Sequence, residues 1–313
     1  MPTLPAMPVF SRADLRAHGW SDSATWRAVR GGRLLRLRHD QFTLAPTQPR
    51  DAAVAAARAC AGSVISHRSA AVVHGLPLLG PPPRRPDLTV EPRGTGDVPA
   101  ALLHRATLPN GDVVTVDGAC LTSVARTVVD LARTVPAAAA VVAADNALQR
   151  RLTTPLEIVE VVDACARWPG IRRARAALRQ VDGRSESPLE SLSRLVVARL
   201  DLPRPQLQVR IRDARGWVVA RTDFYWDDVG AAGEADGRAK YTDREVLTRE
   251  KRRQEELEDL GVSIARWGWL DTRTPELLAA RVRNARERGR RRDASGFSRG
   301  WEVELTAPLT LPL

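Results

Sequence analysis

The segment 221–240, RTDFYWDDVGAAGEADGRAK, constrains the fold more than any other stretch of the sequence. It carries acidic residues inside two strand-like runs, although Asp and Glu are depleted in β-strands. Asp223 lies in an aromatic run, and Glu234 and Asp236 occupy alternate positions of the next run. Because residues i and i+2 of a strand point to the same face, Glu234 and Asp236 are expected to project together.

Carboxylates that converge from two adjacent strands would suit a hard divalent cation. Mg²⁺ is bound by oxygen ligands in near-octahedral geometry, and Mn²⁺ accepts similar ligands. A metal held there would polarise a phosphate and activate water. The expected metal ligands are therefore Asp223, Glu234 and Asp236, and the alternative is ordinary surface charge on an edge strand.

The residues around this segment predict a mixed α/β core. Ser187 is an expected helix cap, with Pro188 at the first helical position and Glu190 at the capping-box position. Capping explains Glu190 by itself, but a metal role is compatible if the helix N-terminus faces the site. Strands are expected at 206–212, 217–226, 233–237 and 262–267, and a charged helix at 243–260.

The net charge of the chain favours a polyanionic partner. Lys and Arg number 48 against 37 Asp and Glu, and the formal net charge is +11. Such an excess favours nucleic acid, and double-stranded DNA is the expected partner. A C-terminal basic helix would add phosphate affinity or form a solvated end through Arg286, Arg288, Arg290, Arg291 and Arg292.

Other sequence features exclude several classes of protein. Cys60, Cys120 and Cys165 form no C-x-x-C pair, which argues against a disulfide framework or a structural zinc site. The longest apolar run, 135–144, is far shorter than the ~20 residues of a membrane span. No Ser/His/Asp arrangement and no Walker-type phosphate loop stands out. A cytoplasmic protein without a membrane partner is expected, and its oligomeric state stays open.

The segment 10–44 predicts a helix, a turn, a second helix and a β-hairpin. Ser11 and Asp14 fit a capping box for the first helix, and the hairpin is expected to turn near His39 and Asp40. This order is typical of a winged helix-turn-helix, and the alternative is a small helical module with a solvated arginine face. The expected DNA contacts are Ser23, Thr25, Arg27 and Arg30 of the second helix, and Arg36 and Arg38 of the wing.

Residues 51–151 predict alanine-rich helices around a few short strands, without an obvious catalytic motif. Strands are expected at 87–91, 102–108 and 113–116, with Asn110-Gly111 as a hairpin turn between the last two. His67 and His74 lie near one face of a predicted helix, but a metal pair needs closer spacing and a third ligand. The region is expected to brace the two ends of the chain or to contact a partner.

Three segments of the first half resemble AbiEi-type antitoxins of type IV toxin–antitoxin systems. They are FSRADLRAHGWSDSATWRAVRGGRLLRLRHDQFTL, ISHRSAAVVHGLPL and CLTSVARTVVDLAR. The wing departs from the family, because HDQF stands where a glycine-containing turn is expected. The resemblance implies binding to the protein's own operator, transcriptional repression and a nucleotidyltransferase-like toxin as partner.

Five ordered blocks of the second half resemble a family of unknown function related to very-short-patch-repair endonucleases, in the PD-(D/E)xK superfamily. They are GRSESPLESLSR, RTDFYW, GEADGRAKY, REKRRQEEL and VSIARWGWLD. The resemblance implies a restriction-endonuclease-like α/β core and Mg²⁺-dependent DNA cleavage. It assigns the metal-binding carboxylates of the motifs to Asp223 and Glu234, and the helix glutamate to Glu190.

The sequence departs from this second family at two positions. Thr222 replaces the proline before Asp223, and Asp236 stands where the motif has its lysine. Lys240 or Lys251 would then supply the missing cation, with Lys240 expected to stabilise charge on the phosphate. The charged helix that carries Lys251 and Arg252 is expected to lie along a phosphate backbone.

The expected architecture is an α+β multidomain chain, with a restriction-endonuclease-like core in its C-terminal half. Two functions stay open. One is a DNA-binding, Mg²⁺-dependent endonuclease that hydrolyses phosphodiester bonds by metal-activated water. The other is an AbiEi-like autorepressor with a degenerate nuclease fold. The expected segments are 1–48 (winged helix-turn-helix), 49–152 (AbiEi-like α/β domain), 153–184 (helical connector), 185–275 (nuclease-like domain) and 276–313 (basic helix and disordered tail).

Overall fold

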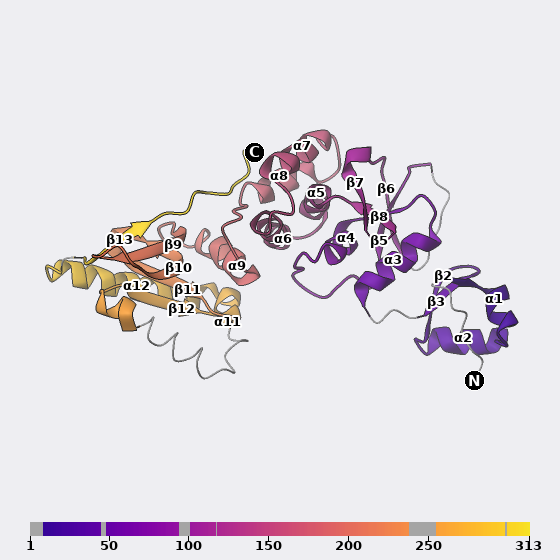
Figure 1. Ribbon diagram of the computed structural model, residues 1–313, viewed down its shortest axis with the longest axis horizontal. Coiled ribbons are helices and arrows are strands. Elements are labelled where there is room, and N and C mark those ends of the chain that lie inside the picture. The colour runs from indigo at the N-terminus through magenta and orange to yellow at the C-terminus, as the bar shows by residue number, and fades with distance from the viewer. Residues whose placement is uncertain (1–8, 45–47, 94–100, 117, 238–254, 298) are drawn as a thin grey trace. The chain divides into compact units, whose positions relative to one another are not determined.

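The computed structural model of the chain describes residues 9–44, 48–93, 101–116, 118–237, 255–297 and 299–313 (Figure 1). These residues form a mixed α+β structure with three β-sheets. None of their helices combines the length and the apolar character that crossing a lipid bilayer requires. The chain divides into unit 1, which comprises Met1–Ala143, Arg151–Arg179 and Pro312–Leu313, and unit 2, which comprises Ala144–Arg150 and Gln180–Leu311.

Unit 1 begins with two short helices and a three-stranded sheet in the order β1-β3-β2. The predicted capping box is confirmed, because Ser11 Oγ accepts from Asp14 N and the Asp14 carboxylate accepts from Ser11 N. The predicted hairpin is confirmed as well, with its turn at His39 and Asp40. The elements are β1 (Phe10–Ser11), α1 (Arg12–Ala17), α2 (Asp22–Arg30), β2 (Leu34–Arg38) and β3 (Gln41–Leu44).

A five-stranded sheet follows in unit 1, in the order β6-β5-β4-β8-β7. The prediction of a hairpin at Asn110-Gly111 is wrong, because β6 and β7 lie at opposite edges of this sheet. β6 pairs with β5, β7 pairs with β8, and Asp112 between them binds the buried Arg126. The elements are α3 (Pro49–Ala59), β4 (Val64–Ile65), α4 (His67–Val73), β5 (Asp87–Val90), β6 (Leu102–Arg105), η1 (Asn110–Asp112), β7 (Val113–Val116) and β8 (Ala119–Thr122).

Four helices complete the first half of the chain. Ser123 and Thr154 cap the first and third of them through their side-chain oxygens. The first of these helices packs against α4 and against the two helices that follow residue 154. The elements are α5 (Val124–Thr134), α6 (Ala137–Gln149), α7 (Pro155–Ala164) and α8 (Ile171–Leu178).

Unit 2 contains a five-stranded sheet in the order β12-β11-β10-β9-β13, in which β11 and β12 are parallel and the other neighbours antiparallel. Alternate residues of β10 pack into two different hydrophobic cores. Phe224 and Trp226 pack in one core, and Tyr225 packs in the other. The elements are α9 (Pro188–Val197), β9 (Gln206–Asp213), β10 (Val218–Trp226), η2 (Asp227–Val229), β11 (Ala231–Ala235), β12 (Ser263–Trp267), α11 (Trp269–Arg273), α12 (Pro275–Ala294) and β13 (Trp301–Glu304).

The prediction of a disordered tail is wrong, because β13 pairs with the edge strand β9. Trp301 is only 8% exposed, and its Nε1 donates to Tyr225 Oη at 2.9 Å. Glu304 forms ion pairs with Arg210 and Arg212 of β9. The tail is ordered because its aromatic residue enters the core and its acidic residue meets basic side chains of β9.

The predicted charged helix at 243–260 lies largely outside the described residues. Residues 255–259 are helical, and Leu257 is buried in the core that contains Tyr225. Lys240, Lys251 and Arg252 lie outside the described residues.

Candidate carboxylate site and candidate DNA-binding surface

Two of the predicted carboxylates, Glu190 of α9 and Asp223 of β10, lie on either side of Gln208. Gln208 Nε2 donates to Glu190 Oε2 at 2.8 Å and lies 3.5 Å from Asp223 Oδ1. The backbone N–H of Ala235 on β11 donates to Asp223 Oδ2 at 2.9 Å. One helix and three strands therefore converge here, and we refer to Glu190, Gln208, Asp223 and Glu234 as the carboxylate cluster.

Gln208 owes its position to an unusual backbone conformation. Leu207 pairs with Phe224 and Val209 pairs with Thr222, so Gln208 stands opposite Asp223 on the neighbouring strand. Its φ of +52° lies in the left-handed region, which non-glycine residues rarely adopt. Leu207 packs in one core of unit 2 and Val209 in the other, so β9 changes face at Gln208. Strained residues of this kind concentrate at functional sites.

Glu190 combines a capping position with membership of the cluster. Its backbone N–H donates to Ser187 Oγ at 3.2 Å, as the predicted cap requires. Its carboxylate accepts from the Glu186 N–H at 2.8 Å, one residue before the cap. The side chain is 7% exposed, so the helix N-terminus holds a buried carboxylate beside Asp223.

Burial and like charge act together on these carboxylates. Burial raises the pKa of Asp223 to about 7, and the charges of Glu190 and Glu234 contribute to the rise. Burial also raises the pKa of Glu190. Because desolvation and neighbouring negative charge both disfavour the ionised form, the cluster holds more negative charge than its surroundings stabilise.

Glu234 is engaged by a basic residue of the next strand. Glu234 and Arg266 are partners in the parallel register of β11 and β12, and Arg266 Nε lies 2.9 Å from Glu234 Oε2. Asp236 lies just beyond β11, where its backbone N–H donates to Trp267 O at 2.8 Å. Within the described ranges, no three His, Cys, Asp or Glu side chains are grouped as a metal site. The structure therefore does not bring the predicted trio of Asp223, Glu234 and Asp236 together.

The cluster nevertheless fits a magnesium ion in charge and donor type. Mg²⁺ usually takes one or two carboxylates and fills its other positions with water and substrate phosphate. Glu190 and Asp223 are two such carboxylates, and the raised pKa of each indicates a charge that a cation would neutralise. Gln208 Oε1 is buried without a hydrogen-bond partner, so a further oxygen donor lies beside them.

The predicted DNA-contacting residues of α2 are not all on its outer face. Ser23, Arg27 and Arg30 are exposed. Thr25 is only 3% exposed, and its hydroxyl donates to Ser21 O at 3.1 Å. The prediction that Thr25 faces outward is wrong, because it lies on the same helix side as the fully buried Ala28.

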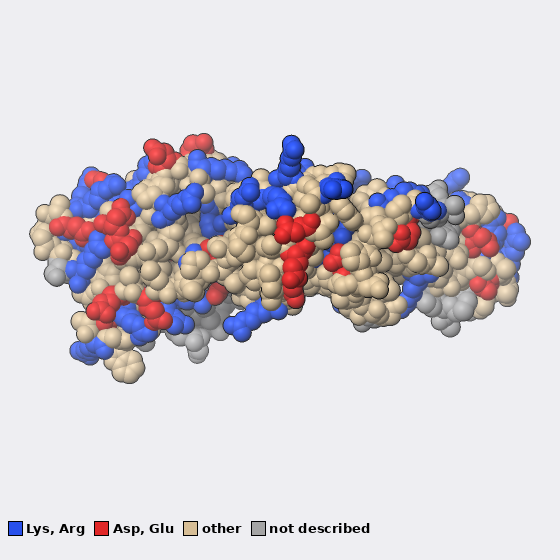
Figure 2. Space-filling model, turned by 90° about the horizontal axis from the view of Figure 1, so that it is seen from above, with Lys and Arg blue, Asp and Glu red and all other residues tan. Residues whose placement is uncertain are grey.

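The hairpin adds basic groups to this surface, one of them beside an exposed aromatic ring of α2. The Arg36 guanidinium lies 5.2 Å from the centroid of the Trp26 ring, and Trp26 is exposed. Arg38 is the last residue of β2, next to the hairpin turn. On the face drawn in Figure 2, basic side chains are spread among acidic ones rather than gathered in one patch.

The basic helix α12 exposes fewer of its arginines than the sequence predicts. Arg286 is buried, and its two terminal nitrogens donate to the two oxygens of Asp228 at 2.8 and 2.7 Å. The Arg292 guanidinium lies 5.1 Å from the centroid of the Trp301 ring. These two arginines bind within unit 2 instead of forming a free phosphate-binding row.

Sequence reasoning missed two residues of the site, Gln208 and Arg266. Gln208 lies in an alternating run, QLQVRIR, that gives no sign of a left-handed residue. Arg266 lies in the predicted strand 262–267, but its pairing with Glu234 depends on the parallel register of β11 and β12. Only strand pairing brings either residue to the carboxylates.

Comparisons with known proteins assign no activity to this chain. No family model matches it. The uncharacterized proteins MT2308 and Rv2248 of Mycobacterium tuberculosis, strains CDC 1551 / Oshkosh and H37Rv, are each 34% identical to it over 176 residues. The match covers 56% of this chain and 65% of the length of each relative. The crystal structure of the RV2827C protein from the same species aligns with 62% of this chain and 82% of its own, with a TM-score of 0.40 and 16% identity.

Proposed function

We propose that this protein binds double-stranded DNA and hydrolyses its phosphodiester bonds in a Mg²⁺-dependent reaction at the carboxylate cluster. The observation that carries the proposal is the burial of Asp223 beside Glu190 and Glu234, because burial first, and the two neighbouring charges second, raise the pKa of Asp223 to about 7. Strong pKa perturbation by burial and specific neighbours is typical of functional sites. The order α9, β9, β10, β11, β12, with β11 parallel to β12, supports a restriction-endonuclease-like core.

Two side chains of the cluster would hold the metal, and their neighbours would fix them in place. Glu190 and Asp223 are the proposed Mg²⁺ ligands, with Mn²⁺ as an alternative ion. A bound divalent cation would polarise the phosphate and supply activated water. Gln208 orients Glu190, and the Ala235 N–H orients Asp223, so both carboxylates are positioned before DNA arrives.

The N-terminal part of unit 1 is the proposed DNA-binding module. Its two helices followed by a paired β2–β3 hairpin support a winged helix-turn-helix. Ser23, Arg27 and Arg30 are exposed on the second helix and would face the major groove. Arg36 and Arg38 of the hairpin would bind phosphate.

A cleavage assay with matched variants tests the nuclease proposal. The intact chain is incubated with supercoiled plasmid and with single-stranded DNA in Mg²⁺, in Mn²⁺ and in EDTA. We expect metal-dependent nicking by the wild type and loss of nicking in Asp223→Asn and Glu190→Gln. Asp201→Asn, which changes an exposed carboxylate, serves as the control. The proposal fails if the wild type cuts no faster than Asp223→Asn in either metal.

A second function is favoured by the Glu234–Arg266 ion pair. Arg266 already neutralises Glu234, and Asp236 stands where the nuclease motif has its lysine. This arrangement supports an AbiEi-like autorepressor that keeps a nuclease fold without its chemistry. A mobility-shift assay with the protein's own upstream DNA tests it, together with copurification of a nucleotidyltransferase-like toxin encoded beside it. Equal affinity for upstream and unrelated DNA would rule out the operator-binding role.

A further inference from the structure

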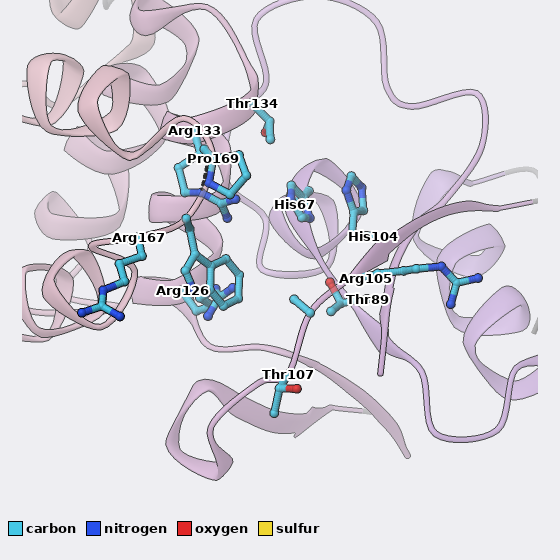
Figure 3. A pocket seen from close by; sticks show the side chains of 12 residues that line it. His67, Thr89, His104, Arg105, Thr107, Arg126, Arg133, Thr134, Arg167 and Pro169 are labelled. Atoms are coloured by element: carbon cyan, nitrogen blue, oxygen red, sulfur yellow. Dashed lines mark hydrogen bonds between the residues drawn. The ribbon is translucent and has the colours of Figure 1, made fainter. Parts of the chain in front are cut away.

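Unit 1 contains a pocket of about 560 Å³ (Figure 3). Small-molecule sites typically measure about 300–1,000 Å³, so its size suits a small ligand. Its walls come from β5, β6, α4, α5 and the loop between α7 and α8. None of the described lining residues is Asp or Glu, and four are arginines: Arg105, Arg126, Arg133 and Arg167.

Two of the arginines are fixed by carboxylates that do not line the pocket. Arg126 is bound by Asp112 at 2.9 Å and by Asp130 at 3.0 Å. Arg133 is bound by Asp130 at 2.8 Å, and its Nε donates to Pro169 O at 2.9 Å. Guanidinium groups held in this way lose little side-chain entropy when a ligand binds.

The charge of the pocket favours an anion. Asp112 and Asp130 balance Arg126 and Arg133, and the exposed Arg167 adds a further positive charge on the same side of the pocket. The planar guanidinium fork matches the oxygens of phosphate. A phosphate-bearing ligand is therefore the chemistry that this wall fits.

Aromatic side chains also line the pocket. Trp168 lines the pocket, and the guanidinium carbons of Arg126 and Arg133 lie 4.2 and 4.8 Å from its ring centroid. His67 and His104 stack with ring centroids 3.6 Å apart and an interplanar angle of 16°. In the view of Figure 3 the two imidazoles stand on one side of the pocket and Arg126, Arg133 and Arg167 on the other. These surfaces suit a planar ring as well as a phosphate.

The two histidines are held in place by a polar network. His67 Nδ1 lies 2.9 Å from Ser66 Oγ, which also accepts from Thr89 Oγ1 at 2.8 Å. Ser66 makes no side-chain bond to the start of α4, although it occupies the cap position. His104 Nε2 lies 2.9 Å from Asp87 Oδ1. Ser66 therefore contacts the pocket-lining His67 instead of capping α4.

His67 is also strained and uncharged. Its φ of +51° lies in the left-handed region, and burial lowers its pKa to about 4, so the imidazole is neutral at pH 7. A buried, left-handed histidine costs stability, and such strain is typical of ligand sites.

We propose that this pocket binds a nucleoside monophosphate, with the phosphate on the guanidinium groups and the base against Trp168 and the His67 ring. The inference goes beyond DNA cleavage, because it concerns a different unit of the chain. The same chemistry could be a free nucleotide or the 5′-phosphorylated end of a nucleic acid strand.

Calorimetric titration of the intact chain tests the proposal. The probes are AMP, adenosine, ribose 5-phosphate and a 5′-phosphorylated single-stranded oligonucleotide. We expect AMP to bind at least about tenfold more tightly than adenosine or ribose 5-phosphate, a difference of about 1.4 kcal/mol. Tighter binding of the oligonucleotide than of AMP would identify a strand end as the ligand. No binding of AMP or of the oligonucleotide at millimolar concentration overturns the proposal.

Four variants distinguish binding in the pocket from effects elsewhere in the chain. Arg167→Ala and His67→Asn should each weaken AMP binding about tenfold, and Asn tolerates the left-handed backbone of His67. Arg172→Ala, at an exposed arginine of α8 outside the pocket lining, should bind as the wild type does. Asp223→Asn should also bind normally, so a failed nuclease proposal leaves this one intact. Equal affinities of the wild type, Arg167→Ala and His67→Asn would overturn it.

Discussion

Arg266 of β12 faces Glu234 of β11 across a parallel strand pair, and its Nε lies 2.9 Å from Glu234 Oε2. In the nuclease proposal, Asp236 stands where the resembled motif has a lysine, and Arg266 of β12 brings a cation beside Glu234 of β11. In the nuclease proposal, Arg266 would stabilise charge on the phosphate, as oriented cations do. In the repressor proposal, it would permanently neutralise Glu234. Both proposals make this ion pair worth testing directly.

Replacing Arg266 should change metal affinity. Arg266→Gln removes a positive charge beside the cluster and releases Glu234, so we expect Mn²⁺ to bind about fivefold more tightly, a gain of about 1 kcal/mol. Electron paramagnetic resonance of free Mn²⁺ measures the affinity. Arg215→Gln, at an exposed arginine of the β9–β10 turn, is the matched control. Unchanged affinity in Arg266→Gln would mean that Glu234 takes no part in metal binding.

Asp223 should make unit 2 less stable as the pH rises. Its pKa is raised from 3.8 to about 7, so the folded protein binds more protons than the unfolded chain between these values. Stability then falls as the pH increases from about 4 to about 7 and changes little above that range. Asp223→Asn should be more stable than the wild type at pH 8 by about 2 kcal/mol, a figure reduced for partial solvent exposure. Urea unfolding at several pH values measures it, and parallel profiles would contradict the prediction.

The outer face of α2 should control salt-dependent DNA binding. Arg27→Ala and Arg30→Ala each remove an exposed cation, so affinity should fall and the slope of log K against log salt should shrink by about 1 per lost phosphate contact. Fluorescence anisotropy with a labelled duplex at several salt concentrations measures both quantities. Arg172→Ala on α8 provides the control. Slopes that do not change would place the DNA-binding surface elsewhere.

The buried charge cluster of α5 should dominate the stability of unit 1. Asp130 is 0% exposed and binds both Arg126 and Arg133. Asp130→Ala leaves the buried Arg126 and the partly buried Arg133 without this partner, so the free energy of unfolding should fall by about 3–5 kcal/mol. Asp163→Ala breaks only the exposed pair with Arg175 and should cost about 0–1 kcal/mol. Chemical denaturation of both variants tests the contrast, and similar losses would contradict it.

The C-terminal strand should be required for the stability of unit 2. Trp301→Ala removes a buried side chain and its hydrogen bond to Tyr225, so we expect a loss of about 3–5 kcal/mol. Trp217→Ala changes a Trp that is 73% exposed and should have little effect. Thermal unfolding followed by circular dichroism distinguishes the two. Equal melting temperatures for Trp301→Ala and the wild type would contradict a stabilising role of the tail and would support the disordered tail that the sequence predicted.

The predictions that held concern local structure. The Ser11–Asp14 capping box and the cap at Ser187 are set by residues within one helical turn. The hairpin turn at His39 and Asp40 depends on two short neighbouring runs. Glu190 and Asp223 were each named as candidates from their local motifs, but that they lie on either side of Gln208 was not predicted.

Most of the predictions that failed concern contacts between segments that are distant in the sequence. Asn110-Gly111 has the composition of a hairpin turn, but the sheet places β6 and β7 at opposite edges. Thr25 is a local failure instead, because it lies two residues from both Ser23 and Arg27, and helical periodicity places it on the opposite side of α2 from them, beside the buried Ala28. The tail lacks a strong local signal, yet Trp301 enters a core made by β9 and β10.

The sequence by itself determined where most helices and strands form and which carboxylates are candidates, because caps, turns and periodicity act over a few residues. Only the tertiary structure decided that Gln208 adopts a left-handed backbone conformation between Glu190 and Asp223. The tertiary structure also decided that Arg266 forms an ion pair with Glu234. It also decided that His67, Trp168 and the arginines line one pocket. The physical reason is that strand register and burial are set by residues distant in the chain, whose contacts exist only once the sheets have formed.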